Sequence, residues 1–430
     1  MSPQWWEIDG HLEVLKNELF IGGENCVKLA NKFETPTYVY NSERIKSNFF
    51  RIRDSLEKHA DREVSVYYAV KANFNPQILS LLSGLGAYAD IVSLNEAYFA
   101  RYNGFIAERI MFTGTSVDDG TMQALLDSGV MINIDSFSQL ERLAKYAPKG
   151  LEISVRWNPG KGAGFNPKTI TAGAESHGRP IKFGIEEKLV LKLCERAKRL
   201  GLKVKSLHQH IGSGWLGEDV YDFLDTVSLT LDMARKMTKA LGYSLDQVDF
   251  GGGPGIRYKE DQKDFPVDAY GKGICDRVKA SNLKFERICI EPGRYIVGDS
   301  GVLLTRVNTV EVKNGNLIVG VDAGFNTLIR PAFYGAHHEI VDASRILGPE
   351  DICTIAGPLC ETGDLLAIKR RMTRPREGDV LAILNAGAYG YSMSSVYNLQ
   401  PRAAEVMVTN GSPRLITRRE TVRDLKRLHV

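Results

Sequence analysis

The sequence lacks the features expected of a membrane or exported protein. No apolar stretch approaches the ~18 residues that a membrane-spanning helix needs. The N-terminus carries acidic residues early and has no basic segment followed by an apolar one, so we expect no secretory signal. These absences predict a cytoplasmic protein with no membrane partner.

Cysteine and excess charge are also scarce. The six cysteines form no CxxC pair and have no regular spacing, which favours free thiols in a reducing compartment. Lys and Arg total 55 against 52 Asp and Glu, and no basic block stands out. We therefore expect no nucleic-acid partner.

The 430-residue chain does contain a regular alternation of two patterns between about residues 42 and 291. Short apolar runs rich in β-branched and aromatic residues alternate with longer amphipathic stretches. The eight apolar runs, each read as a strand, cover residues 64–70, 87–93, 109–114, 130–136, 151–157, 204–211, 247–251 and 287–292. Strands that alternate with helices predict right-handed βαβ units and a parallel sheet.

Eight such units over roughly 250 residues predict an α/β fold, a closed (β/α)8 TIM barrel. Helix start and stop signals support it: residues 75–86 open with Asn-Pro and close with glycine, and residues 217–241 are long and amphipathic. The alternative is an open doubly wound sheet. It is less favoured because no strand is followed by a G-x-G-x-x-G turn that opens a helix.

The alternating sequence pattern ends at about residue 292. Two Asn-Gly pairs, at 314–315 and 410–411, lie between β-rich runs and predict hairpins. The N-terminal segment is also strand-like. We therefore predict a barrel domain over 42–291 and a second, mostly antiparallel β domain formed from both chain ends, 1–41 and 292–430.

An irregular segment follows the fifth predicted strand. Residues 160–183 include five glycines between 160 and 178. Loops of this length in compact domains are usually functional or disordered. In a barrel, this one lies at the catalytic face.

Lys71 ends the first predicted strand. A lysine at the C-terminal end of a barrel strand points into the site, where partial desolvation of its amine suits Schiff-base chemistry. The alternative is a solvated lysine at a strand end.

Three consecutive glycines, Gly251, Gly252 and Gly253, follow the seventh predicted strand. Their backbone N–H groups suit an anion such as a phosphate. The run matches neither a dinucleotide fingerprint nor a Walker loop. The alternative is a tight turn.

His210 and Ser213 follow the sixth predicted strand and offer a flat ring and a hydroxyl to a bound cofactor. His208 lies on the same strand face as His210. A two-histidine metal site lacks a carboxylate at suitable spacing, so we predict no metal and a hydrogen-bonded core role for His208.

Glu291 and Arg294 end the eighth predicted strand. Arg294 is suited to hold a carboxylate or phosphate in bidentate fashion, unless the two residues form an internal ion pair. Cys360 lies beside Glu361. A thiol flanked by acids suits proton donation better than nucleophilic attack, and the alternative is a buried small hydrophobe.

Two further segments carry polar and aromatic side chains. They are consistent with a snug polar pocket, or with a turn that exposes aromatic rings. The residues are Arg330, Tyr334, His337, His338, Tyr389 and Tyr397.

Taken together, these motifs resemble the pyridoxal-phosphate decarboxylases with an alanine-racemase-like barrel, over nearly the whole chain. The matching motifs, in the family's order, are YAVKAN, HQHIGSG, GGGPGI, EPGRYIVG, DAGFNTLIRPAFYGAHH, GPLCETGD and GAYGYSMSSVYN. The resemblance implies the fold predicted from periodicity, and pyridoxal 5'-phosphate as the cofactor.

The resemblance also implies residue roles. Lys71 would hold the cofactor covalently, His210 would stack on its ring, and Glu291 would pair with the ring nitrogen. The other implied cofactor-binding residues are Ser213, Gly251, Gly252, Gly253, Arg294 and Tyr389. The family forms homodimers with shared active sites, so the catalytic Cys360 would come from the partner subunit together with Glu361.

The resemblance also indicates which residues bind the substrate. The implied substrate-binding residues are Arg294, Arg330, Tyr334, Glu361 and Tyr389. A distal carboxylate needs such arginines. Arg330 therefore favours decarboxylation of meso-2,6-diaminopimelate to L-lysine and CO2, a step of lysine biosynthesis.

Other activities stay open. They are decarboxylation of a related amino acid (a siderophore or carboxynorspermidine precursor, ornithine or lysine), a non-catalytic pyridoxal-phosphate-binding protein, or an amino-acid racemase. The segments around Cys360 and Tyr389 argue against the small non-catalytic proteins, because these lack the second domain.

Overall fold

The computed structural model describes residues 3–429, which fold into two compact units. One unit holds residues Phe49–Ile256 and Lys263–Tyr295. The other holds the chain up to Asn48, the short piece Arg257–Gln262 and everything from Ile296 onward.

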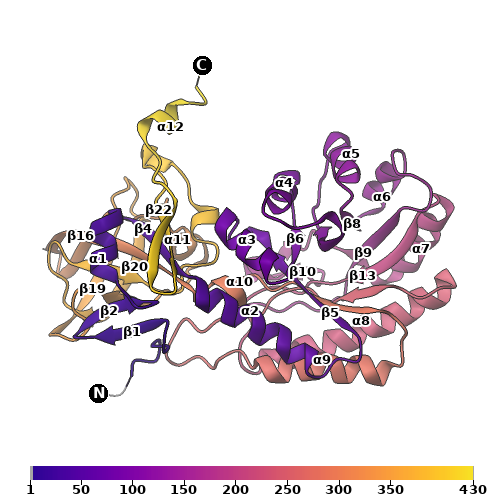
Figure 1. The fold of residues 1–430 in the computed structure, drawn as a ribbon, viewed down its shortest axis with the longest axis horizontal. Coiled ribbons are helices and arrows are strands. Elements are labelled where there is room, and N and C mark those ends of the chain that lie inside the picture. Colours follow the sequence, from indigo (N-terminus) through magenta and orange to yellow (C-terminus); the bar gives the residue numbers. More distant parts are fainter. Residues whose placement is uncertain (1–2, 430) are drawn as a thin grey trace. The chain divides into compact units, whose positions relative to one another are not determined.

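Eight parallel strands of the first unit form a closed barrel (Figure 1). Neighbouring strands pair in chain order, and β15 pairs with β5 to complete the ring. The strands are β5 (Glu63–Ala69), β6 (Tyr88–Ile91), β7 (Ile110–Phe112), β8 (Met131–Ile134), β9 (Glu152–Asn158), β13 (Lys203–His208), β14 (Gln247–Asp249) and β15 (Arg287–Ile290). The predicted barrel is confirmed, and each of its strands coincides with a predicted apolar run.

Helices connect these strands along the outside of the barrel (Figure 1). They are α3 (Pro76–Gly84), α4 (Leu94–Tyr102), α5 (Asp119–Ser128), α6 (Phe137–Leu143), α7 (Glu187–Arg199), α8 (Asp219–Leu241) and α9 (Val267–Ser281), with α2 (Ser42–Glu57) ahead of β5. Side-chain caps fix several helix starts: Asn75 accepts from the N–H of Gln77 and Ser136 from that of Gln139. These short, capped connections leave the C-terminal strand ends together at one end of the barrel.

The segment between β9 and α7 is more ordered than we predicted. It contains a 3-10 turn (η3, Pro167–Thr169), a small hairpin of β10 (Glu175–Ser176) and β11 (Arg179–Pro180), and β12 (Ile185–Glu186), which pairs in parallel with β9. The side chain of Asn158 organises its start, because Oδ1 accepts from the N–H groups of both Gly160 and Gly173. Sequence periodicity could not detect strands of only two residues.

The second unit is built on a nine-stranded, mostly antiparallel sheet. Its strands are β4 (Thr37–Asn41), β16 (Gly301–Lys313), β17 (Asn316–Val321), β18 (Ile340–Asp342), β19 (Glu350–Ala356), β20 (Leu365–Thr373), β21 (Val380–Ile383), β22 (Ala404–Thr409) and β23 (Ser412–Thr417). β4 pairs with both β16 and β22, so an N-terminal strand lies between C-terminal ones, as the indigo and yellow ribbons show (Figure 1). The predicted β fold built from both chain ends is confirmed.

Both predicted hairpins are present. Asn314 and Gly315 join β16 to β17, and Asn410 and Gly411 join β22 to β23, with all four residues at positive φ. Two successive left-handed residues are what a tight hairpin turn requires, and Asn-Gly is the pair that adopts them most readily.

The core of the second unit also draws on both chain ends. A three-stranded sheet (β1, Leu12–Leu15; β2, Glu18–Ile21; β3, Glu24–Asn25) and α1 (Cys26–Phe33) come first in the chain. Leu19 and Leu29 pack in one buried cluster with Leu304 and Ala382. α10 (Arg294–Val297) begins in the barrel unit and ends in the second unit, which also holds α11 (Arg330–Tyr334) and α12 (Val422–Lys426). No helix within residues 3–429 has the length and apolar character to cross a membrane.

Candidate active site

Charged side chains meet at the C-terminal ends of the barrel strands. Lys71 follows β5, and its Nζ lies 2.5 Å from Oδ2 of Asp90 on β6. Asp90 is fully buried, and burial, reinforced by the charge of Glu291, raises the pKa of its carboxyl, while the charge of Lys71 acts in the opposite direction. Sequence reasoning did not select Asp90, because it lies inside the predicted strand 87–93 and not at its end.

Glu291, directly after β15, pairs with a histidine from another strand. Its Oε2 lies 3.1 Å from Nε2 of His208 on β13. Burial raises the pKa of Glu291 to about 7, although Lys71 and Arg156 favour its charged form. Burial and the charge of Arg156 hold the pKa of His208 well below its usual value, which favours a neutral imidazole beside this carboxyl.

A third buried group completes this cluster. One ring nitrogen of His208 and one carboxylate oxygen each of Asp249 and Glu291 all lie within 4.8 Å of one another. Oδ1 of Asp249 accepts from the N–H of Gly251, and burial, together with the charge of Glu291, raises the pKa of Asp249 well above its usual value. Spacing along the sequence could not reveal this cluster, because its three residues come from three separate strands.

The three glycines form a turn that admits no side chain. A Cβ added at Gly251 would lie 2.2 Å from the carbonyl oxygen of Gln209, and one at Gly252 would lie 2.2 Å from that of Glu291. A Cβ at Gly253 would lie 2.0 Å from the indole ring of Trp215. Close backbone approach therefore requires glycine at all three positions.

His210, Ser213 and Arg294 also lie in the barrel unit. Nη2 of Arg294 donates to Oγ of Ser213 at 3.3 Å, which joins the end of β15 to the segment after β13. Burial and the charges of Arg156 and Lys71 hold the pKa of His210 well below its usual value. Of the eight predicted cofactor residues of this unit, six follow the strand ends of β5, β13, β14 and β15: Lys71, His210, Gly251, Gly252, Gly253 and Glu291. Ser213 lies in the loop after β13, and Arg294 begins α10.

The remaining predicted residues lie in the β unit. Arg330 is 1% exposed, and its Nε donates to Nε2 of His338 at 3.2 Å. Its guanidinium lies over the rings of Tyr258 and Tyr334, with centroid distances of 5.6 and 5.9 Å. Nδ1 of His338 donates to the carbonyl oxygen of Leu384, so this histidine holds the arginine through its unprotonated nitrogen.

Cys360 and Glu361 lie on an exposed turn between β19 and β20. The N–H of Cys360 donates to Oδ1 of Asn398, and the hydroxyl of Tyr397 donates to Oε1 of Glu361 at 2.6 Å. The interpretation of Cys360 as a buried small hydrophobe is wrong, because its side chain is exposed. Tyr389, the last predicted residue, has a left-handed backbone with φ of 57°.

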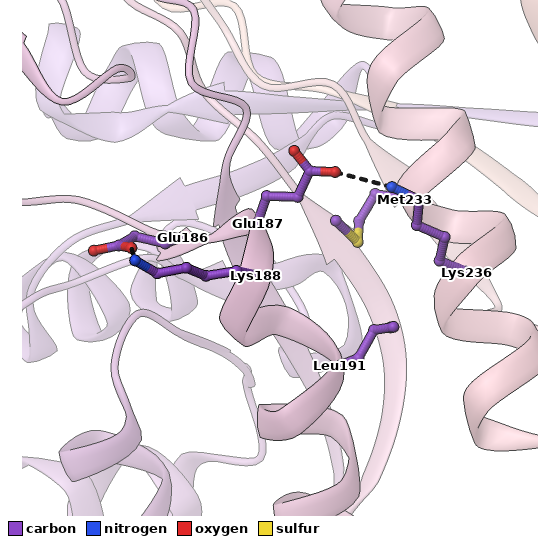
Figure 2. Close-up of a pocket in the computed structure, with 6 residues that line it drawn as sticks. All are labelled: Glu186, Glu187, Lys188, Leu191, Met233 and Lys236. Carbon is purple, nitrogen blue, oxygen red and sulfur yellow. Dashed lines mark hydrogen bonds and ion pairs between the residues drawn. The ribbon is translucent and has the colours of Figure 1, made fainter.

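One pocket lies away from these residues, between the start of α7 and α8 (Figure 2). It has a volume of about 540 Å³. Its charges are paired: Glu187 with Lys236 at 2.9 Å and Glu186 with Lys188 at 3.0 Å, beside Leu191 and Met233. It contains no predicted site residue.

Comparison with known proteins matches this geometry. Residues 42–298 match the family model for the pyridoxal-binding domain of pyridoxal-dependent decarboxylases. A relative from Methanothermobacter thermautotrophicus named diaminopimelate decarboxylase is 43% identical over 417 residues, which cover 96% of this chain and 95% of the relative. One of the same name from Aquifex aeolicus is 38% identical, with 96% of each chain covered.

Solved structures agree. Diaminopimelate decarboxylase from M. jannaschii in complex with L-lysine superposes with a TM-score of 0.89 at 31% identity, covering 98% of both chains. The Helicobacter pylori enzyme with L-lysine gives a TM-score of 0.84 at 33% identity, covering 93% of this chain and 98% of that one.

The barrel, its lysine at a strand end and these matches define a pyridoxal-dependent amino-acid decarboxylase. Within that class, the chain belongs to the diaminopimelate decarboxylase family.

Proposed function

We propose that this protein decarboxylates meso-2,6-diaminopimelate to L-lysine and CO2 with pyridoxal 5'-phosphate as its cofactor. The observation that carries the proposal is the near full-length match, across both units, to relatives named for that activity. The proposal includes the division into a cofactor-binding barrel over 42–291 and a β domain formed by 1–41 and 292–430.

The residues present fit the cofactor. Oε1 of Glu291 is buried and has no hydrogen-bond partner within residues 3–429, which suits a protonated ring nitrogen as the missing partner. The glycine turn has no side chains that would keep a phosphate from its backbone, although the N–H of Gly251 already donates to Asp249. Lys71 supplies the amine.

Different residues are proposed to bind different parts of the cofactor. Lys71 would hold the aldehyde carbon, His210 would lie against the ring, and Glu291 would pair with the ring nitrogen. The phosphate would be held by Ser213, Gly251, Gly252 and Gly253, with Arg294 at the edge of the site and Tyr389 as a further cofactor-binding residue. When bound, pyridoxal phosphate supplies the electron sink that stabilises the negative charge left at Cα when CO2 departs.

The chain's own residues then direct the proton transfers. Glu291 pairs through Oε2 with neutral His208, which leaves its buried Oε1 to accept the proton of the ring nitrogen. The thiol of Cys360 is the proposed proton donor to Cα after loss of CO2. Asp90 favours the ammonium form of Lys71 and so orients that amine before substrate arrives.

Substrate choice rests on the arginine of the β unit. A buried guanidinium stacked between two tyrosine rings is suited to a carboxylate, which ornithine and lysine lack at their distal end. We assign Arg330, Tyr334 and Glu361 to the distal amino-acid end of diaminopimelate, with Arg294 and Tyr389 at the cofactor side.

We also propose a homodimer in which Cys360 and Glu361 serve the partner's barrel. Their exposed turn suits contact with a second copy. Helix α4 offers an apolar surface for such contact, because Tyr98 and Tyr102 are 56% and 88% exposed. Five buried free cysteines fit a reducing compartment, and we place the protein in the cytoplasm.

The test is CO2 release from meso-diaminopimelate, lysine and ornithine measured in parallel with the purified protein. We expect CO2 release from meso-diaminopimelate alone, with L-lysine as the product. Arg330→Met should raise KM for diaminopimelate more than tenfold, whereas Arg371→Met, at an exposed arginine of the same unit, should leave it unchanged. Equal turnover of lysine or ornithine would contradict the proposed substrate.

A further inference from the structure

The ring of His210 is held in one tautomer by the backbone two residues further along the chain. The N–H of Gly212 donates to Nδ1 of His210 at 3.1 Å. A ring nitrogen that accepts a hydrogen bond carries no proton, so a neutral His210 has its proton on Nε2. Burial and the charges of Arg156 and Lys71 favour that neutral ring.

Thr171, in the segment between β9 and α7, reaches the same histidine. Its Oγ1 lies 2.9 Å from the carbonyl oxygen of His210 and 3.0 Å from Nδ1. Since Nδ1 and the carbonyl oxygen are both acceptors, the hydroxyl donates its proton to the carbonyl oxygen or shares it between the two. One hydroxyl therefore touches both the backbone and the ring of His210 and restricts rotation of the ring.

The segment that carries Thr171 lies directly on the backbone after β13. The N–H groups of Thr171 and Ala163 both donate to the carbonyl oxygen of Ile211, at 3.2 and 3.1 Å. A Cβ at Gly212 would lie 1.9 Å from the carbonyl oxygen of Ala163. Glycine at 212 thus permits the approach that places Thr171 against His210.

The ring edge opposite Nδ1 faces the glycine turn. Nε2 of His210 lies 3.5 Å from the position of a Cβ built on Gly252. A ring held through Nδ1 therefore presents its protonated Nε2 edge at the turn that we assign to the cofactor phosphate.

We propose that Thr171 is a positioning residue that fixes the ring plane of His210, with its proton on Nε2, against the cofactor. This inference rests on the proposed function, in which the cofactor ring lies against His210. It makes the segment between β9 and α7 a structural part of the cofactor site.

The test uses the cofactor-free full-length protein labelled with 15N-histidine. Long-range proton–nitrogen spectra report which ring nitrogen carries a proton, and His210→Gln assigns the signal. We expect an unprotonated Nδ1 and a protonated Nε2 in the unsubstituted protein. In Thr171→Val, the Nδ1 signal should shift and broaden, whereas Thr171→Ser should retain the original signal.

A second readout is the dissociation constant for pyridoxal phosphate, from titration of the cofactor-free protein. Loss of one hydrogen bond of about 0.5–1.5 kcal/mol predicts a roughly two- to tenfold weaker affinity in Thr171→Val. Ser176→Ala is the matched control, because its hydroxyl donates to the carbonyl oxygen of Pro167 within the same segment. We expect this control to keep both the spectrum and the affinity.

Three results would overturn the inference. They are a proton on Nδ1 in the unsubstituted protein, an unchanged spectrum and affinity in Thr171→Val, or an equal loss in Ser176→Ala. The first needs no substitution at Thr171 and holds even if Thr171→Val prevents folding. Because the spectra require no substrate, failure to decarboxylate diaminopimelate would refute the proposed function separately.

Discussion

Nζ of Lys71 lies 2.5 Å from Oδ2 of Asp90, and the two partners differ in solvent exposure. The side chain of Asp90 is 0% exposed, whereas that of Lys71 is 35% exposed. A buried carboxylate beside a partly exposed amine stabilises the ammonium form of that amine. The proposed covalent capture of the cofactor needs the neutral amine, so we expect Asp90 to influence the pH at which capture occurs.

Asp90→Asn should therefore allow capture of pyridoxal phosphate at lower pH. The amide removes the negative charge that favours the ammonium, and we expect the midpoint of borohydride-trappable cofactor to move down by about one pH unit. The control is Asp246→Asn, which removes the carboxylate from another Lys–Asp pair of the barrel unit, at 2.7 Å from Lys205. An unchanged midpoint in Asp90→Asn would show that the ion pair does not control the amine.

Gly252→Ala should weaken cofactor binding. Its Cβ would lie 2.2 Å from the carbonyl oxygen of Glu291, so either the turn or the end of β15 must shift. Overpacking of this kind costs about 1–3 kcal/mol, which predicts a roughly five- to hundredfold higher dissociation constant for pyridoxal phosphate. Gly84→Ala is the control, because a Cβ there meets nothing within 4 Å. Equal affinities of the two variants would contradict a turn that must be side-chain-free.

The fold could be predicted because its signals are local. The alternation of apolar and amphipathic stretches predicted all eight barrel strands. Two Asn-Gly pairs predicted hairpins, and their four residues have positive φ in the structure. The two-residue strands β10 and β11 gave no such signal, because their pairing depends on contacts made by the whole segment.

The candidate site was predictable only in part. Residues such as Lys71 and Glu291 follow strands and belong to recognisable motifs. The partners of these residues come from other strands: His208 meets Glu291 across 83 positions of sequence. Thr171 lies 39 positions from His210 in a segment without periodicity, so only the folded chain brings their atoms together.

Asp342 should make the stability of the protein depend on pH. Burial, and then the negative charge of Asp379, raises the pKa of Asp342 from 3.8 to about 7. A carboxyl whose pKa is raised in the folded state favours folding when it is protonated. Its contribution is complete below about pH 4 and is lost as pH rises through about 7.

Asp342→Asn should therefore reduce the fall in thermal midpoint between pH 4 and pH 8. The amide carries no charge at either pH, so one source of that fall disappears. Asp351→Asn is the control, because Asp351 lies in an exposed pair, 3.6 Å from Arg374. Thermal unfolding of the cofactor-free protein across this range measures the effect, and a slope identical to that of the unsubstituted protein would contradict it.

Tyr397→Phe should impair substrate binding through Glu361. The tyrosine hydroxyl donates to Oε1 of Glu361 at 2.6 Å, and this hydrogen bond is the largest cause that raises the pKa of Tyr397 to about 12. Without it, Glu361 gains rotational freedom and loses the orientation in which we expect it to meet the distal end of diaminopimelate.

Because that end is remote from the proposed reacting carbon, KM should rise about three- to tenfold while kcat changes less. Tyr146→Phe is the matched control, since Tyr146 is also an exposed tyrosine that donates to a carboxylate, Asp119, in the barrel unit. A fall in kcat with constant KM would instead place the role of Tyr397 at the proton transfer by neighbouring Cys360. The two outcomes separate substrate positioning from chemistry, because Tyr397 and Asn398 hold adjacent residues of one turn.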